Sequence, residues 1–107
     1  MQNYILRQKR KVDEMVDYVV WFENLEIAIL NININKENIF IRQIRVFEDF
    51  KRQGHASRII EFLLEKYNRP IRLCIATNSK SAVAFWGNFL KTHKNNHIRG
   101  EIYELTN

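Results

Sequence analysis

The chain has 107 residues, which is room for one domain, and we expect a single domain over residues 1–107. Hydrophobic residues make up 46% and charged residues 27%, which indicates a folded globular protein and excludes a disordered chain. There are 17 Lys and Arg against 12 Asp and Glu, so the net charge is +5 and favours anionic partners.

The sequence also restricts the compartment. No apolar run approaches the roughly 20 residues that a membrane span needs, and the first residues lack the apolar segment of a signal peptide. Cys74 is the only cysteine, which excludes an internal disulfide and a cysteine-based zinc cluster. We therefore expect a cytoplasmic protein without a membrane partner.

The N-terminal segment fits two structures. Tyr4–Leu6 suits a short strand, and from Val12 to Val20 the apolar residues follow helical spacing. Tyr18–Phe22, however, is β-branched and aromatic, as strands are. The residue pattern alone leaves helix and strand open here.

Two strands with a polar turn between them come next. Residues 26–35 and 39–46 alternate in polarity, and the turn-forming segment 35–38 separates them, which predicts an antiparallel hairpin. Strict alternation in the second strand places four side chains on one side of it: Phe40, Arg42, Ile44 and Val46.

The rest of the chain alternates helices and strands. An apolar stripe predicts a helix that begins near Gly54 and ends at 68–70, followed by a strand over 71–76. The polar run 77–81 offers N-caps for a second helix, and residues 97–105 fit a closing strand. We expect an α/β fold with a mixed sheet, in which the strands at 39–46 and 71–76 are parallel.

A basic loop leads into the first of these helices. Ile44–Val46 end a strand, Lys51 and Arg52 add positive charge, and Gly54 lacks a Cβ that would block close approach. Free N–H groups and the helix dipole favour a diphosphate at such a helix start. Taken alone, the loop fits an ordinary strand–helix turn with a solvated basic patch at least as well.

Two segments in this order resemble the GCN5-related N-acetyltransferases, the GNAT superfamily. The first motif of that family is a strand L-x-V followed by [Q/R]-x-x-G-x-[G/A], and Ile44–Val46 and Lys51–Ala56 stand in its place. The second motif, N-x-x-A-x-x-F-Y, corresponds to Ser79–Trp86. Tyr18–Ala28 is similar to the family's second and third strands with their tight turn, which favours a strand at 16–22.

The resemblance implies acetyl-CoA as the cosubstrate and direct attack by a primary amine on the acetyl carbon in a ternary complex. It implies that the amides of 52–57 hold the pyrophosphate and that the strand ending at Val46 pairs with the pantetheine arm. An N–H near Arg45 or Val46 would polarise the thioester carbonyl. The residues expected to bind the cofactor are Ile44, Arg45, Val46, Lys51, Arg52, Gln53, Gly54, His55, Ala56, Ser57, Asn78, Ser79 and Trp86.

Several positions depart from the family pattern at the catalytic residues. Trp86 stands where many members have a tyrosine acid, and Phe40 and Arg42 stand where many have a glutamate base. Glu26 and Cys74 are therefore the candidate catalytic residues, although Cys74 fits a small buried hydrophobic position better than an acyl-accepting thiol. Two further carboxylates, Glu48 and Asp49, fit a solvated loop better than a base.

The family's usual helices between its first two strands have almost no room in this chain. An open acceptor site is therefore expected, which suits a small amine, a protein or a tRNA, or a homodimer that completes the wall. His93 and His97 have a helical spacing but no apparent third ligand, so we expect no metal site. His55 fits either a positive charge near phosphate at low pH or a solvated loop residue.

Two other functions stay open on the sequence. A non-catalytic acyl-CoA-binding protein would keep the loop and lose the acid and base. A nucleic-acid-binding module, including an acetyltransferase directed at aminoacyl-tRNA, would use the segment 66–100, which holds seven basic residues and no acidic one.

Overall fold

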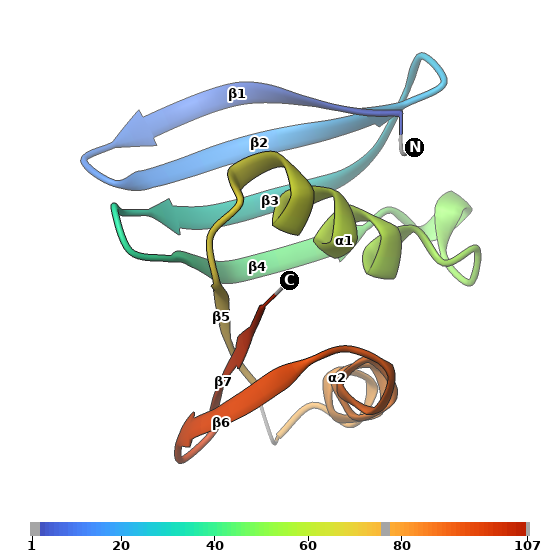
Figure 1. The fold of residues 1–107 in the computed structure, drawn as a ribbon. Helices are drawn as coiled ribbons and strands as arrows, with labels where there is room; N and C mark the ends of the chain where they lie inside the picture. Colours follow the sequence, from blue (N-terminus) through green and yellow to red (C-terminus); the bar gives the residue numbers. More distant parts are fainter. Residues whose placement is uncertain (1–2, 76–77, 107) are drawn as a thin grey trace.

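The computed structural model describes residues 3–75 and 78–106. One mixed sheet of seven strands carries two α-helices and a short 3-10 helix, η1 (Glu48–Phe50) (Figure 1). The sheet order is β1-β2-β3-β4-β5-β7-β6. The elements are β1 (Tyr4–Val12), β2 (Met15–Phe22), β3 (Leu25–Ile34), β4 (Ile39–Val46), α1 (His55–Tyr67), β5 (Ile71–Cys74), α2 (Lys80–Thr92), β6 (Asn95–Arg99) and β7 (Ile102–Leu105).

The first four strands form an antiparallel meander, and the ambiguous N-terminal segment is strand throughout. Two residues separate β1 from β2, so no helix lies between them, as expected. The turn between β2 and β3 is Glu23–Asn24, and both residues have positive φ (51° and 65°). Such a turn matches the twist of the flanking strands, which explains the short connection.

A bulge at Arg42 makes the predicted alternation in β4 wrong. Asn31 pairs with Gln43 and Ile32 with Ile41, so Arg42 is an extra residue without a partner on β3. Beyond it, Ile44 and Val46 lie opposite Leu30 and Ala28 on the face that packs against the helices. Phe40 pairs with Asn33 and lies on the other face. One inserted residue therefore moved the second half of the strand to the opposite face.

β4 and β5 are parallel, as predicted, but they pair only briefly. The register runs from Ile39–Ile71 to Ile41–Leu73. The bulge follows at once, and within the described part of the chain the remainder of β4 has no strand partner on that edge. The strand predicted over 71–76 ends earlier, because β5 ends at Cys74. Residues 76 and 77, which include the start of the predicted polar run 77–81, lie outside the described part of the chain.

The single closing strand predicted at 97–105 is instead a hairpin. β6 and β7 are antiparallel, and β7, not β6, pairs with β5. Gly100 has a φ of 52° at the turn, a conformation that glycine adopts without strain. An apolar run interrupted by one glycine was the available signal for a turn.

Both helices lie on one face of the sheet and share its core. Ile59, Ile60 and Leu63 of α1 are fully buried, and Trp86 and Phe89 of α2 belong to the same cluster. His93, which follows α2, contacts Glu61 of α1 through Nε2 and Oε2 at 2.9 Å. Among the described residues, no helix covers the opposite face, and neither helix is long and apolar enough to cross a bilayer.

Candidate functional site: a groove between β4 and two helix starts

A groove of about 670 Å³ lies where the end of β4 meets the N-terminal parts of α1 and α2. Three segments that are distant in the sequence line it: the end of β4, the loop into α1, and the first half of α2. The lining residues are Ile44, Arg45, Val46, Phe50, Lys51, Arg52, Gly54, His55, Ala56, Ser57, Ser79, Ser81, Ala82, Phe85 and Trp86. We call it the helix-side groove.

The β4 wall offers backbone groups that no neighbouring strand uses. Phe47 donates its N–H to the Ile27 carbonyl of β3 at 2.8 Å. In an antiparallel ladder this pattern makes Val46–Ala28 and Ile44–Leu30 non-hydrogen-bonded pairs, so the N–H groups of Ile44 and Val46 point away from β3. The register with β5 has already ended at Ile41. An extended ligand can therefore add to this edge as a further strand.

The start of α1 offers a second set of free donors. Gly54 is the N-cap residue, and no side chain caps the helix there. The first turn holds no acidic residue. The first N–H groups of a helix have no partner within it, so the amides of His55, Ala56 and Ser57 remain available for an anion.

The backbone before α1 is turned back by two left-handed residues. Arg52 has a φ of 64° and Gly54 a φ of 80°. A Cβ built at Gly54 would meet only the end of the Arg58 side chain, at 3.9 Å. Within the free protein, the positive φ rather than a lack of space is what favours glycine here, and the predicted close approach of a ligand to Gly54 remains a prediction.

A buried polar network holds this loop against the sheet. Tyr4 of β1 and His55 of α1 are 5% and 4% exposed, and the Tyr4 hydroxyl lies 2.9 Å from His55 Nδ1. Arg58 donates from Nη2 to the Gln53 carbonyl at 2.7 Å and from Nε to the Tyr4 hydroxyl at 3.3 Å. The first strand thus fixes the loop through side chains that are 51 residues apart.

The structure contradicts one of the two roles that the sequence suggested for His55. It is buried, so it is not a solvated loop residue. Burial and the Arg58 guanidinium lower its pKa below the usual 6.5, against a smaller opposing effect of Glu23. The imidazole is therefore neutral near pH 7, and a positive charge beside a phosphate at low pH remains a prediction.

The start of α2 forms the opposite wall, and one of its own side chains caps it. The Ser79 hydroxyl accepts from the Ala82 N–H at 3.3 Å, which caps the helix. Phe85 and Trp86 follow, with ring centroids 4.9 Å apart, and Trp86 is only 7% exposed. This wall is apolar, whereas the α1 start opposite it carries Lys51 and Arg52.

Most of the residues expected to bind a cofactor meet in this groove, but four expected site residues do not. Gln53 and Asn78 do not line it. Glu26 is an exposed residue near the start of β3, and Cys74 lies at the end of β5; neither lines the groove. Cys74 is exposed, so its interpretation as a small buried hydrophobic residue is wrong.

Sequence reasoning missed four lining residues and a supporting one. Phe50, Ser81, Ala82 and Phe85 line the groove. Ala82 and Phe85 are positions of the second motif, so the motif was an available signal. Tyr4, by contrast, gives no sign in the sequence of its contact with His55.

The carboxylate nearest the loop is engaged with a lysine. Glu48 of η1 pairs with Lys51 at 3.0 Å, and this contact lowers the pKa of Glu48. Both side chains are exposed. Glu48 is therefore ionised at neutral pH and poorly suited to take a proton from an ammonium group.

Solved structures with a similar arrangement include proteins that were determined with a bound cofactor. A GNAT family acetyltransferase from Elizabethkingia anophelis, with acetyl-CoA bound, matches with a TM-score of 0.66 and 10% identity over 100% of both chains. An acetyltransferase from Bacillus subtilis in complex with CoA matches with a TM-score of 0.66 and 10% identity over 97% of both chains. The chain has the GNAT fold.

Other comparisons define the extent of this likeness. A protein from Bacteroides thetaiotaomicron assigned to the GNAT family of acetyltransferases matches with a TM-score of 0.66 and 13% identity over 91% of this chain. The match spans only 64% of that protein, which is longer. No protein-family model and no curated protein matches the sequence. The predicted GNAT fold is thus confirmed, and the activity has to be argued from the site.

Proposed function

We propose that this chain is an acetyl-CoA-dependent N-acetyltransferase that transfers an acetyl group to a primary amine by direct attack in a ternary complex. The observation that carries the proposal is the helix-side groove, where an unpaired strand edge at 44–46 meets an uncapped helix start at Gly54. The GNAT-fold structures with acetyl-CoA or CoA bound support the same cosubstrate.

The residues present suit each part of acetyl-CoA. The diphosphate would lie on the amides of 55–57, with Lys51 and Arg52 beside it. The pantetheine arm, which carries amide groups, would pair with the backbone of Ile44 and with the Val46 carbonyl. The apolar wall at Phe85 and Trp86 would exclude water from this part of the groove.

The chain's own contribution to the reaction is orientation and charge stabilisation. Bound acetyl-CoA supplies a thioester, and a neutral amine forms the new C–N bond while the C–S bond breaks and the thiolate leaves. The Val46 N–H, which points away from β3, would donate to the carbonyl oxygen as negative charge develops there. The amine must lose one proton and the leaving thiolate must gain one.

Apart from His55, which is buried and bonded through Nδ1 to the Tyr4 hydroxyl, the groove offers no obvious acid or base for these protons. Its described lining residues include no carboxylate, tyrosine or cysteine, and the indole N–H of Trp86 is no practical acid. Water would then carry the protons, and the roles predicted for Glu26 and Cys74 remain predictions. The same observation favours a second candidate, a protein that binds acyl-CoA without turning it over.

Thermal unfolding with and without ligand tests the proposal. Acetyl-CoA at about 100 times its Kd should stabilise the fold by about 2.7 kcal/mol, which is several degrees for a domain of this size. Acetyl-pantetheine, which lacks the diphosphate, should shift the Tm much less at equal concentration. No shift with millimolar acetyl-CoA would contradict the proposal.

Release of CoA thiol separates the two candidates. Purified protein is incubated with acetyl-CoA and a panel of amines, and free thiol is measured over time. Amine-dependent release supports the transferase. A clear Tm shift without release on any amine would favour the non-catalytic acyl-CoA-binding protein.

A further inference from the structure

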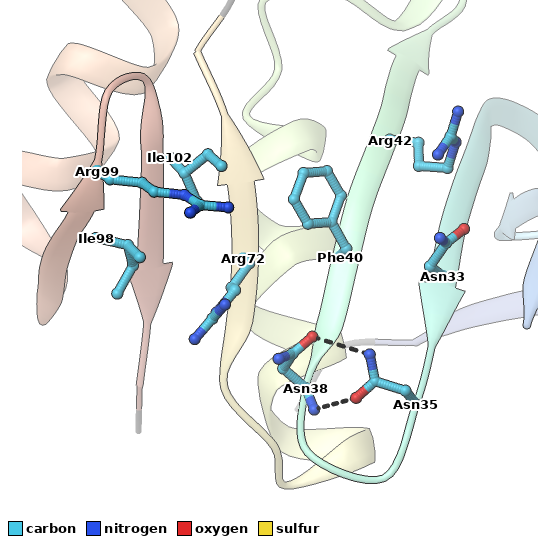
Figure 2. Close-up of a pocket in the computed structure, with 9 residues that line it drawn as sticks. All are labelled: Asn33, Asn35, Asn38, Phe40, Arg42, Arg72, Ile98, Arg99 and Ile102. Atoms are coloured by element: carbon cyan, nitrogen blue, oxygen red, sulfur yellow. Dashed lines mark hydrogen bonds between the residues drawn. The ribbon is translucent and has the colours of Figure 1, made fainter.

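The second face of the sheet carries a groove of its own. It measures about 610 Å³ and is lined by Asn33, Asn35, Asn38, Phe40, Arg42, Arg72, Ile98, Arg99 and Ile102 (Figure 2). No helix contributes to it, and none of its described lining residues is acidic. We call it the basic groove.

Three arginines give the basic groove its charge, and they come from three separate parts of the chain. Arg42 is the bulge residue of β4, Arg72 lies in β5, and Arg99 extends from the β6–β7 hairpin (Figure 2). Arg72 pairs with Glu104 at 2.9 Å, and its side chain is still 38% exposed. Among the described residues, neither Arg42 nor Arg99 forms an ion pair with a carboxylate. The guanidinium groups of Arg42 and Arg99, together with the exposed part of Arg72, can therefore contact an anion.

The basic segment noted in the sequence is not one patch in the fold. Of its seven basic residues, only Arg72 and Arg99 line the basic groove. Arg69 is used internally and donates from Nη1 to the Asn35 carbonyl at 2.7 Å. Arg42, which lies outside the segment, completes the set. The pairing of the strands, rather than closeness in the basic segment, brings these three arginines to one groove.

Besides its charge for phosphate, the basic groove offers groups that suit a planar, hydrogen-bonding nucleobase. Phe40 is half-buried, so part of its ring is open to a planar partner. Asn33 Oδ1 is buried and has no hydrogen-bond partner, and a donor from a ligand would satisfy it. Asn35 and Asn38 hold the β3–β4 turn by bonding each other (Figure 2). An acidic peptide would use the arginines and leave the aromatic ring without a planar partner.

We propose that the basic groove binds single-stranded nucleic acid, with phosphates on Arg42, Arg72 and Arg99 and a base against Phe40. Open single strands suit such a surface because bases stack on aromatic side chains while cations track the backbone. This binding does not rest on the proposed transferase function.

Fluorescence anisotropy with a short, unstructured, labelled RNA tests the binding without acetyl-CoA. Each phosphate contact contributes about 0.7 to the slope of log Kd against log salt for single strands, so three contacts predict a slope of about 2. The double variant Arg42→Ala/Arg99→Ala should reduce this slope by about 1.4. Phe40→Ala should weaken binding about tenfold with little change in the slope.

A matched control variant also removes two positive charges, but from the helices on the opposite face of the sheet. Lys66 and Lys91 are exposed on α1 and α2, and Lys66→Ala/Lys91→Ala should leave the slope unchanged. RNA binding that is absent at low salt, or lost equally in both double variants, would overturn the proposal. Polyglutamate that competes as well as unlabelled RNA would also overturn it, in favour of an acidic protein partner.

The two proposals fail in distinguishable ways. Arg42→Ala/Arg99→Ala should keep the full Tm shift with acetyl-CoA, because both residues lie outside the helix-side groove. A Tm shift with acetyl-CoA but no RNA binding would contradict the proposal for the basic groove and leave the proposed transferase function standing. RNA binding without any Tm shift with acetyl-CoA would contradict the transferase function and leave the proposal for the basic groove standing.

Discussion

The two grooves use the same strand, β4, in opposite ways. On the helix side, binding groups come largely from the backbone: the unpaired edge at 44–46 and the amides at the start of α1. On the helix-free side, they are side chains of Arg42, Arg72 and Arg99 that three segments bring together. Backbone donors recognise a ligand that lies extended along them, whereas separate guanidinium groups recognise charge spread along a chain.

The comparison also predicts that the two binding sites respond differently to substitutions. A backbone site depends on local conformation, so it should be sensitive to changes in φ or in the N–H group itself. A site made of exposed side chains should lose affinity gradually as charges are removed. The predictions below test this difference on the helix side, from the largest expected effect to the smallest.

The largest effect is expected from charge at Gly54. Gly54→Asp places a carboxylate where the diphosphate is proposed to bind, whereas Gly54→Asn has the same shape, lacks the charge and tolerates a positive φ. We expect Gly54→Asp to weaken acetyl-CoA binding at least about 100-fold, and Gly54→Asn to weaken it far less. Titration calorimetry measures both. Equal affinity in the two variants would place the diphosphate elsewhere.

A large effect on rate is expected at Val46. Val46→Pro removes an N–H that points away from β3, so the ladder to β3 keeps its hydrogen bonds. Loss of one donor to a developing oxyanion typically costs about 100-fold in kcat, and we expect a loss of that order. Val46→Ala keeps the N–H and is the control. If Val46→Pro folds, by circular dichroism, and turns over like Val46→Ala, this N–H has no catalytic part.

A smaller effect is expected from the cap of α2. Ser79→Ala removes the acceptor for the Ala82 N–H and should lower the free energy of unfolding by about 1 kcal/mol. Urea unfolding measures this change. Ser81→Ala is the matched control, because Ser81 lies two residues on and does not cap the helix. A loss as large in Ser81→Ala would show that the cap contributes nothing.

The most gradual effect is expected on acidification. The pKa of His55 is lowered in the folded protein, so the unfolded chain binds the proton more readily. The contribution of His55 is therefore present above about pH 6.5 and is lost as pH falls toward its folded pKa. Removing the imidazole in His55→Gln should therefore flatten the dependence of the unfolding free energy on pH below about 6.5. Parallel curves for wild type and His55→Gln would contradict this.

How far the sequence predicted the molecule differs between the grooves. The helix-side groove follows from residues close together in two motifs, because Lys51–Ala56 and Ser79–Trp86 form local backbone structure wherever the rest of the chain lies. The β3–β4 hairpin and both helices were predictable for the same reason, and the crossover rule predicted the parallel pair of β4 and β5. The contact between Tyr4 and His55 was not, since nothing in either residue's neighbourhood specifies a partner 51 positions away.

The basic groove shows why register matters. Strict alternation predicted Phe40 on the same face of the sheet as Ile44 and Val46. The bulge at Arg42 instead places Phe40 on the opposite face. A bulge depends on how two strands pair, which the sequence of one strand does not specify. The turn at Gly100, which makes the β6–β7 hairpin and places Arg99, was overlooked although its glycine was a visible signal.

Amide hydrogen exchange on the wild-type protein tests the central claim most directly. With saturating acetyl-CoA, followed residue by residue by NMR, exchange should slow at the amides of Ile44 and Val46 and at His55, Ala56 and Ser57. The amides of the basic groove should be unaffected. Protection centred on the helix-free face, or none at 44–46 and 55–57 despite bound ligand, would contradict the account.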